Sequence, residues 1–213
     1  MQTNDIFDAI TVVIPAYNEE HRIASVIKEV SLYFQNILVI DDNSTDNTKL
    51  MALESGAKII DNKYSKGHLG SIKTGFRSVK TEWIATIDAD GEHSIEDLVN
   101  ISNFALSSDY DLIIGRRFLN QISRPGEIIL STIAYIKSPI FDTGSGLRVL
   151  KSDLARKMEL YGKCVCGTFV LEALSLGAKI GDFPIRLNHI SKPRNIAWHH
   201  FRQILILLKL LFT

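Results

Sequence analysis

Five short apolar runs, separated from one another by helical patterns, constrain the fold of this chain more than any other feature. The runs are rich in Val and Ile, which is typical of strands buried on both faces, and they lie at Ile10–Pro15, Asn36–Asp41, Ala57–Ile60, Trp83–Asp88 and Asp111–Gly115. Between them, apolar spacing predicts helices at Glu19–Phe34, Asp46–Ser55, Leu69–Val79 and Ser94–Leu106. This βαβα order predicts a mostly parallel sheet with right-handed crossovers, flanked by helices.

Start and stop signals mark the ends of these helices. Asp46 and Ser94 are N-cap candidates, Ser94 with Asp97 three residues later, and Gly56 is a candidate stop. A chain of 213 residues can bury a full core. We therefore predict a single α/β domain.

After Phe118 the Gly and Pro punctuation becomes irregular, and one helix is predicted near residues 128–137. Residues 146–162 and 168–187 add strand and helix pieces, which we expect to pack beside the sheet. Residues 183–193 are expected to lead out of the fold.

Charge is unevenly distributed, although the net charge is zero. Residues 1–100 carry nine basic and 16 acidic side chains, whereas residues 183–213 carry five basic side chains and no acidic one. A basic, apolar tail suits an anionic surface. Basic clusters interleaved with aromatic residues are absent elsewhere in the sequence, so nucleic acid is not an expected partner.

Two further patterns bear on the location of the protein. Cys164 and Cys166 form a lone C-x-C without a second pair, which favours reduced thiols over a zinc site. The first residues contain acids where a signal peptide has its positive segment, and no apolar run approaches the ~20 residues of a membrane span. We expect the protein on the cytoplasmic side of a membrane.

Polar residues follow the predicted strands, as "PAYNE", "DDNSTD", "DNKYSKG", "DADGEH" and "GRR". Ligands of an open parallel sheet collect outside the carboxyl ends of its strands. Helix caps alone would account for one acidic strand end, but hardly for several. The pattern therefore predicts one ligand site that contacts several strands.

"DADGEH" supplies three acids at alternate positions, Asp88, Asp90 and Glu92. Oxygen ligands without His or Cys suit Mg²⁺ or Mn²⁺, which complete their shell with water and substrate phosphates. Gly91 allows the chain to turn so that these oxygens converge. The alternative is that Glu92 only places negative charge at the start of the next helix.

Two other strand ends predict nucleotide contacts. Asp42, beside Asp41, can accept from a base N–H or hold ribose hydroxyls, whereas Ser44 and Asp46 are typical of turns and caps. Lys66 and Gly67 precede a helix, where an anion or a close backbone approach is favoured. This is not a Walker loop, and Lys66 alone is also compatible with a solvated side chain.

The motif series resembles family 2 glycosyltransferases of the GT-A fold, which is Rossmann-like. The similarity is greatest to the dolichyl-phosphate mannose synthase and polyprenyl-phosphate glycosyltransferase group. It runs from "VVIPAYNEE" through "ILVIDDNSTD", "KGHLGSIKTGF", "TIDADGEHSIEDL", "IIGRRF" and "DTGSGLRVLK" to "EALSLGAKIGDFPIR" and "ISK". It implies a catalytic domain over 1–195, with a nucleotide-sugar half (1–95) and an acceptor half (96–195), followed by an amphipathic tail (196–213).

The resemblance also implies roles for individual residues. Catalysis would rest on Asp90 and Arg117, with the metal held by Asp88, Asp90 and Glu92. The implied substrate-binding residues are Pro15, Tyr17, Glu19, Ile40, Asp42, Lys66, Gly67, Asp88, Ala89, Asp90, Glu92, Arg117, Arg148, Arg186 and Lys192. Gly91-Glu92 stands where Leu-Gln is usual and Arg116 where Ser is usual, and the stretch between residues 126 and 142 looks shorter than in the family.

The implied reaction moves a hexose from a nucleotide sugar, of the GDP-mannose or UDP-glucose type, to a polyprenyl phosphate, with inversion. A lipid phosphate is already anionic and needs no general base. The alternative acceptor is a saccharide hydroxyl in cell-surface glycan synthesis, which needs a base such as Asp142 or Glu172. The sugar, the base and the oligomeric state are left open, including a homo-oligomer.

The tail from Ile196 to Phe212 is too short to span a bilayer and is interrupted by His199, His200, Arg202, Gln203 and Lys209. It is suited to lying in a membrane interface, which would place the protein peripherally on the cytoplasmic face. The alternative is a helix that packs on the domain or on a second copy.

Three other protein classes share parts of this pattern. A receiver-type phosphoacceptor module is smaller and has its acid pair after the first strand, whereas here the pair follows the second. A nucleotidyltransferase has a Gly-rich basic loop where this chain has "PAYNEEHR". A non-catalytic binding protein of the same fold is disfavoured by the intact acids.

Overall fold

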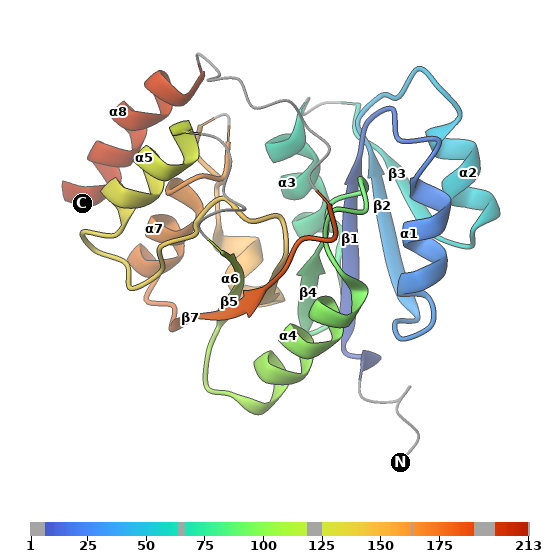
Figure 1. Cartoon of the computed structure of the whole chain (residues 1–213), viewed down its shortest axis with the longest axis horizontal. Helices are drawn as coiled ribbons and strands as arrows, with labels where there is room; N and C mark the ends of the chain where they lie inside the picture. Colours follow the sequence, from blue (N-terminus) through green and yellow to red (C-terminus); the bar gives the residue numbers. More distant parts are fainter. Residues whose placement is uncertain (1–6, 64–66, 119–124, 163, 190–198, 213) are drawn as a thin grey trace.

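The computed structural model describes residues 7–63, 67–118, 125–162, 164–189 and 199–212. Seven strands form one sheet in the order β3-β2-β1-β4-β6-β5-β7 (Figure 1). The strands are β1 (Ile10–Ala16), β2 (Asn36–Asp41), β3 (Lys58–Asp61), β4 (Trp83–Thr86), β5 (Leu112–Arg117), β6 (Arg148–Lys151) and β7 (Ile180–Ile185). The helices are α1 (Ile23–Val30), α2 (Thr48–Glu54), α3 (His68–Ser78), α4 (Ile95–Ser107), α5 (Pro125–Ala134), α6 (Ser152–Lys157), α7 (Thr168–Ser175) and α8 (His199–Phe212).

The predicted α/β architecture with a mostly parallel central sheet is confirmed. β1 pairs in parallel with β2 and with β4, and β2 in parallel with β3. β6 is the exception, because it runs antiparallel to both β4 and β5. The expectation that residues 146–162 pack beside the sheet was wrong for β6, which lies inside it. Residues 180–185, also expected beside the sheet, form its edge strand β7, parallel to β5.

Each face of the sheet is covered by its own apolar layer. On one face, Ile27 of α1 and Leu98 of α4 pack against strand residues such as Val12 and Ala85. On the other face, Phe76 of α3 and Phe169 of α7 pack against alternate strand positions. These runs are apolar at consecutive positions because both faces are buried. The sheet is thus fixed from both sides, and its carboxyl edge is left for the site.

The boundaries of two elements differ from their prediction in ways that matter for the site. β4 ends at Thr86, so Ile87 and Asp88 extend past the last paired residue. α1 begins at Ile23, so Glu19 belongs to the loop that precedes the helix. The predicted helix stop is confirmed, because Gly56 follows α2 with φ +87°, a conformation that glycine adopts without strain.

The C-terminal segment forms the amphipathic helix that was predicted, but its apolar stripe packs on the domain. Leu207 and Leu211 of α8 are buried against Leu130 of α5 and Leu171 of α7. Gln203, 1% exposed, donates from Nε2 to the carbonyl oxygen of Cys164 at 2.7 Å. Among the described helices, none is both long and apolar enough to cross a bilayer.

Candidate active site

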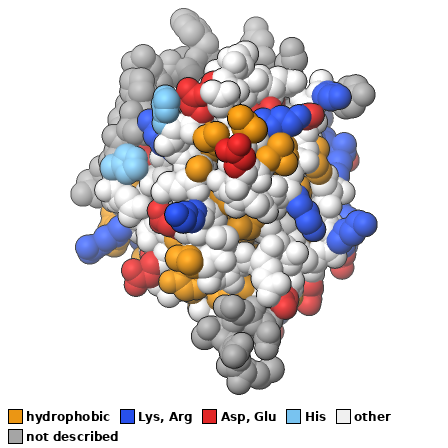
Figure 2. Space-filling view, turned by 90° about the vertical axis from the view of Figure 1, so that its right-hand side faces the viewer, with side chains coloured by type: hydrophobic (Ala, Val, Ile, Leu, Met, Phe, Trp, Pro, Cys, Tyr) orange, Lys and Arg blue, Asp and Glu red, His pale blue; other side chains and the backbone are white. Residues whose placement is uncertain are grey.

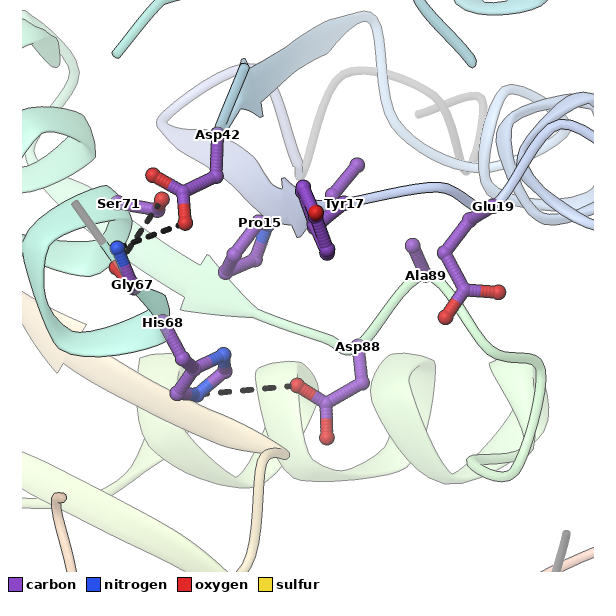
Figure 3. A pocket seen from close by; sticks show the side chains of 10 residues that line it. Pro15, Tyr17, Glu19, Asp42, Gly67, His68, Ser71, Asp88 and Ala89 are labelled. Atoms are coloured by element: carbon purple, nitrogen blue, oxygen red, sulfur yellow. Dashed lines mark hydrogen bonds and ion pairs between the residues drawn. The ribbon is translucent and has the colours of Figure 1, made fainter. Parts of the chain in front are cut away.

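A pocket of about 470 Å³ opens at the carboxyl ends of β1, β2 and β4 and beside the start of α3. It is lined by Pro15, Ala16, Tyr17, Glu19, Asp42, Gly67, His68, Ser71, Asp88 and Ala89. Asp42, Gly67 and Ser71 gather at one end, and Asp88, Ala89 and Glu19 lie toward the other (Figure 3). Predicted residues from the ends of β1, β2 and β4 thus share one cavity, of a size typical for small-molecule sites, whereas Asp90, Glu92 and Arg117 are not among the residues that line it.

Hydrogen bonds between the loops after β1 and β2 position Glu19. Its backbone N–H donates to Thr48 Oγ1 at 2.7 Å. Asn18, with φ +54°, donates its own N–H to Ser44 Oγ at 3.1 Å. Asp46 Oδ1 accepts from the Thr48 N–H at 3.0 Å. The N-cap of α2 is thus Asn47, one residue after the predicted Asp46, although Asp46 still bonds to the first residue of the helix. The loops form one wall of the pocket.

Asp42 is held at one end of the pocket by two donors. Its Oδ2 accepts from the Gly67 N–H at 2.7 Å, and its Oδ1 accepts from Asn62 Nδ2 at 2.9 Å. Gly67 adopts φ +88°, which brings this N–H to the carboxylate as α3 begins. The N–H of Gly67 therefore helps to orient Asp42, while the predicted role of Gly67 toward a ligand stays a prediction.

Asp88 lies in a cradle beyond the end of β4. Its Oδ1 is 4.0 Å from His68 Nε2 and its Oδ2 is 3.9 Å from His93 Nε2. Below it the chain passes so closely that a Cβ at Gly146 would overlap Oδ2 and lie 2.7 Å from Cγ. Burial lowers the pKa of His93, although the negative charge of Asp88 acts to raise it. The carboxylate of Asp88 therefore has a defined position facing the pocket.

The acids that follow Asp88 form a tight turn. Asp90 is 2% exposed, and its Oδ1 accepts from the Glu92 N–H at 3.1 Å, while Gly91 takes φ +71°. Among the described residues, no three His, Cys, Asp or Glu side chains are grouped as a metal site. An oxygen-only set of this kind still fits Mg²⁺ or Mn²⁺, which bind through one or two carboxylates together with phosphates. The three-ligand assignment stays a prediction.

Arg117 is bound by two acids of its own chain. Its Nε and Nη2 donate to the two oxygens of Asp142, each at 2.8 Å, and Nη2 also donates to Glu127 at 3.0 Å. Burial would lower the pKa of Arg117, but these two carboxylates outweigh burial and hold the pKa above its usual value. Its predicted contact with the diphosphate stays a prediction, while Asp142, 0% exposed, is fully engaged by this arginine.

Arg148 is the second arginine beneath this edge of the sheet. It is 0% exposed, its guanidinium lies 4.7 Å from the ring centroid of Phe169, and within the described chain its three nitrogens have no hydrogen-bond partner. Burial lowers the pKa of Arg148 to about 10, although Asp88 and Asp142 counteract it. The structure places it in the core and not on the pocket wall, so its predicted substrate contact stays a prediction.

Glu172, the other base candidate, is buried in α7 and accepts from backbone N–H groups. Glu159 donates to its Oε1, and Leu160 donates to Oε2 at 3.0 Å. Burial raises the pKa of Glu172 although these donors oppose the shift. The carboxylate therefore stabilises the chain at Leu160, which adopts φ +54°.

We expect Glu172→Gln to lower the free energy of unfolding by about 1–3 kcal/mol, because an amide NH₂ would then face backbone donors. The catalytic rate should change less than about twofold. Urea unfolding and initial rates test this, with Glu159→Gln, on an exposed side chain paired with Lys73, as the control. A large loss of kcat at unchanged stability would instead support Glu172 as the general base.

Of the remaining predicted residues, the two that the structure describes, Ile40 and Arg186, do not line the pocket. Ile40 is fully buried in the core. Arg186 follows β7, where its N–H donates to Asp97 Oδ2 at 3.0 Å and its guanidinium lies 5.3 Å from the Phe118 ring. Lys66 and Lys192 lie outside the described residues. The predicted contacts of all four with substrate therefore stay predictions.

Some residues of the site were missed in the sequence. Ala16, His68 and Ser71 line the pocket. His68 and Ser71 lie three positions apart on one turn of α3, which follows directly from the polar strand end "DNKYSKG". That helical spacing was the available signal.

A family model described as "Glycosyl transferase family 2" matches residues 11–165. Among curated proteins, an uncharacterised protein of Methanocaldococcus jannaschii is 31% identical over 206 residues, covering 87% of this chain and 84% of that protein. A UDP-N-acetylglucosamine–dolichyl-phosphate N-acetylglucosaminyltransferase of Methanococcus voltae is 26% identical, covering 83% of this chain and 84% of its own. The low-salt glycan biosynthesis hexosyltransferase Agl6 of Haloferax volcanii is 28% identical, but this chain spans only 54% of it.

Solved structures with the same fold include glucosyl-3-phosphoglycerate synthase from Mycobacterium tuberculosis. Its complex with phosphoglyceric acid has a TM-score of 0.81 at 17% identity, covering 99% of this chain and 84% of that one. A second complex, with Mn²⁺, UDP-glucose and phosphoglyceric acid, has a TM-score of 0.76 at 18% identity, covering 98% and 83%. This similarity establishes the GT-A fold.

Proposed function

The chain belongs to glycosyl transferase family 2, and we propose that it moves a hexose from a GDP-mannose- or UDP-glucose-type donor to a polyprenyl or dolichyl phosphate. Its use of a nucleotide sugar follows from the family. Because Asp42 and Asp88 lie in different parts of the pocket, we assign the Asp42 end to the nucleoside and the Asp88 end to the diphosphate and sugar. The dolichyl-phosphate N-acetylglucosaminyltransferase of M. voltae supports the acceptor class.

The observation that carries the choice of acceptor is the state of the two base candidates. Asp142 is fully buried and bound by Arg117, and Glu172 is buried and bound by backbone N–H groups. A hydroxyl acceptor needs a base within hydrogen-bonding reach of its proton, and neither carboxylate is available for that role. A lipid phosphate carries its negative charge already and can attack the anomeric carbon directly.

In the proposed reaction, the phosphate oxygen of the acceptor forms a bond to the anomeric carbon while the bond to the nucleoside diphosphate breaks. Because the displacement is direct, the configuration of the sugar inverts. Asp42 and Gly67 fix the nucleoside, Asp88 orients the sugar, and the loops after β1 and β2 close one wall, so that catalysis consists largely of alignment. Asp88, Asp90 and Glu92 would hold Mg²⁺ or Mn²⁺, which neutralises charge on the diphosphate when bound.

A transfer assay with GDP-mannose, UDP-glucose and UDP-N-acetylglucosamine, each with Mg²⁺ or Mn²⁺, tests the function. Polyprenyl phosphate is one acceptor, and a soluble saccharide and the unphosphorylated polyprenol are the controls. We expect transfer to the phosphate alone, since it needs no base. Transfer to the saccharide but not to the lipid phosphate would overturn the acceptor assignment.

The surface of α5 and α8 supports peripheral contact with a membrane. Its exposed apolar side chains are Ile129, Tyr135, Ile136, Leu205, Leu208 and Phe212, with Phe212 88% exposed. The charged side chains described as exposed on and directly after these helices are Lys137 and Lys209, both basic. On the opposite side of the molecule, over α1, α2 and β3, basic and acidic side chains are interspersed (Figure 2). We therefore assign the α5–α8 surface to anionic lipid on the cytoplasmic face.

We expect the double variant Leu205→Asp/Phe212→Asp to bind phosphatidylglycerol vesicles at least about tenfold more weakly, because two apolar anchors become acids. Vesicle sedimentation measures this. The matched control is Leu50→Asp/Leu53→Asp, which alters two exposed leucines of α2 on the opposite side. Unchanged vesicle binding together with a changed molecular mass in light scattering would assign this surface to a second copy of the chain.

A further inference from the structure

We propose that Asn62 is a positioning residue for nucleotide recognition, because it orients the carboxylate of Asp42 toward the nucleoside of the donor. This inference rests on the proposed function, in which Asp42 meets the base or ribose. Asn62 directly follows β3 and is 1% exposed. It is not among the residues that line the pocket, so it acts through its neighbour.

The backbone of Asn62 is anchored to the end of β2. Its N–H donates to the carbonyl oxygen of Asp41 at 2.8 Å, and its own carbonyl oxygen accepts from Asn43 Nδ2 at 2.9 Å. Asn43 can reach this carbonyl from a left-handed conformation, φ +61°, which Asn tolerates better than most residues. The position of Asn62 is therefore set by the same strand end that carries Asp42.

The side-chain amide of Asn62 has partners that fix its orientation. Nδ2 donates to Asp42 Oδ1 at 2.9 Å and to Ser71 Oγ at 3.1 Å, and Oδ1 accepts from Thr74 Oγ1 at 2.8 Å. A carboxylate can only accept, so the NH₂ group must face Asp42 and the carbonyl oxygen must face the hydroxyl of Thr74. A flipped amide would place the carbonyl oxygen of Asn62 against Asp42 Oδ1, so that two acceptors would face each other without a donor.

Both oxygens of Asp42 are consequently held by the protein. Oδ1 accepts from Asn62, and Oδ2 accepts from the Gly67 N–H at 2.7 Å, while the residue still lines the pocket (Figure 3). Each carboxylate oxygen keeps a further lone pair for the ligand. The nucleoside thus meets a carboxylate whose rotation is already fixed, and the entropy of fixing it is not lost on binding.

Loss of the Asn62 amide is expected to weaken binding of the nucleoside end of the donor only. Removing the amide frees Asp42 to rotate and leaves the hydroxyls of buried Ser71 and half-buried Thr74 with one partner fewer. Hydrogen bonds to charged groups are among the stronger ones in proteins, so we expect about a tenfold loss of nucleotide affinity. The diphosphate end, at Asp88, should be unaffected.

Calorimetric titration of UDP, GDP and inorganic pyrophosphate in Mn²⁺ tests this inference. We expect Asn62→Ala to raise the Kd of whichever nucleoside diphosphate the wild type binds by about tenfold, with the affinity for pyrophosphate unchanged. Asn36→Ala is the matched control, because that amide bonds to the Asp8 carbonyl oxygen at the other end of β2. Thr74→Val keeps Asn62 and Asp42 and should give a smaller loss in the same direction, which provides a second variant if Asn62→Ala folds poorly.

A double-mutant cycle with Asp42→Ala separates positioning from general packing. If Asn62 acts through Asp42, adding Asn62→Ala to Asp42→Ala should cost no further affinity. Additive losses, equal losses for pyrophosphate, or an unchanged Kd in Asn62→Ala would each overturn the inference while the proposed function stands. A wild-type protein that binds neither UDP nor GDP would overturn both.

Discussion

Asp90→Asn should lower kcat/KM for sugar transfer by about 10³-fold or more while leaving the protein folded. The substitution removes the charge proposed to hold the metal. A bound metal ion supplies several kcal/mol of transition-state stabilisation, which the variant would lose. The amide oxygen can still accept the hydrogen bond that Asp90 Oδ1 receives from the Glu92 N–H. Asp90→Ala should abolish activity as well, at an additional cost of about 1 kcal/mol in stability for that lost bond.

Initial rates and the Mn²⁺-induced rise in melting temperature with a bound nucleotide measure this prediction. Glu96→Ala is the matched control, since Glu96 is an exposed acid in the first turn of α4, a few residues further along the chain. We expect its rate to stay within about twofold of the wild type. If Asp90→Asn retained activity and its response to Mn²⁺, the metal assignment would be wrong.

Gly146→Ala should reduce kcat/KM by about a hundredfold, although it adds a single methyl group. That methyl would overlap Asp88 Oδ2 and lie 2.7 Å from its Cγ. The backbone has little room to retreat, because the carbonyl oxygen of Gly146 accepts from buried Thr86 Oγ1 at 2.8 Å. Asp88 must move instead, and a displacement of about 1 Å in a catalytic site can cost 10²-fold in rate.

The control for this variant is Gly181→Ala, whose methyl would meet the ring of Tyr110 at 3.0 Å. Tyr110 is 36% exposed and can move away from the methyl group. Both variants should lose some stability, and we expect a loss of transfer in Gly146→Ala alone. Equal activity in the two variants would show that Asp88 does not depend on the backbone beneath it.

Much of the pocket at the ends of β1, β2 and β4 could be predicted from local pattern. The predicted strands at residues 10–15, 36–41 and 83–88 correspond to β1, β2 and β4, and the polar residues after them share one pocket. This worked because strand, turn and helix signals are local, and because the carboxyl ends of neighbouring parallel strands meet at one edge.

The parts that could not be predicted depend on contacts between distant residues. Asp142 binds Arg117 across 25 residues, and Gln203 bonds to Cys164 across 39. The sequence around Arg117 does not indicate that the carboxylates of Glu127 and Asp142 bind its guanidinium. Asn62 presents the same difficulty, since its polar position after β3 is visible but its bond to Asp42 is not. The apolar stripe of α8 is equally compatible with lipid or protein, and only packing against α5 and α7 decides.

The central position of β6 has a mechanical consequence. This strand bonds to β4 of the predicted nucleotide-sugar half and to β5 of the predicted acceptor half, so one continuous ladder crosses the predicted boundary between them. A two-lobed enzyme that closes on its ligand bends at a flexible linker between lobes, whereas here such a bend would have to break main-chain hydrogen bonds in the middle of a buried sheet. In the proposed function, donor and acceptor are therefore held on one stiff platform, and we expect loops at its rim to govern substrate capture.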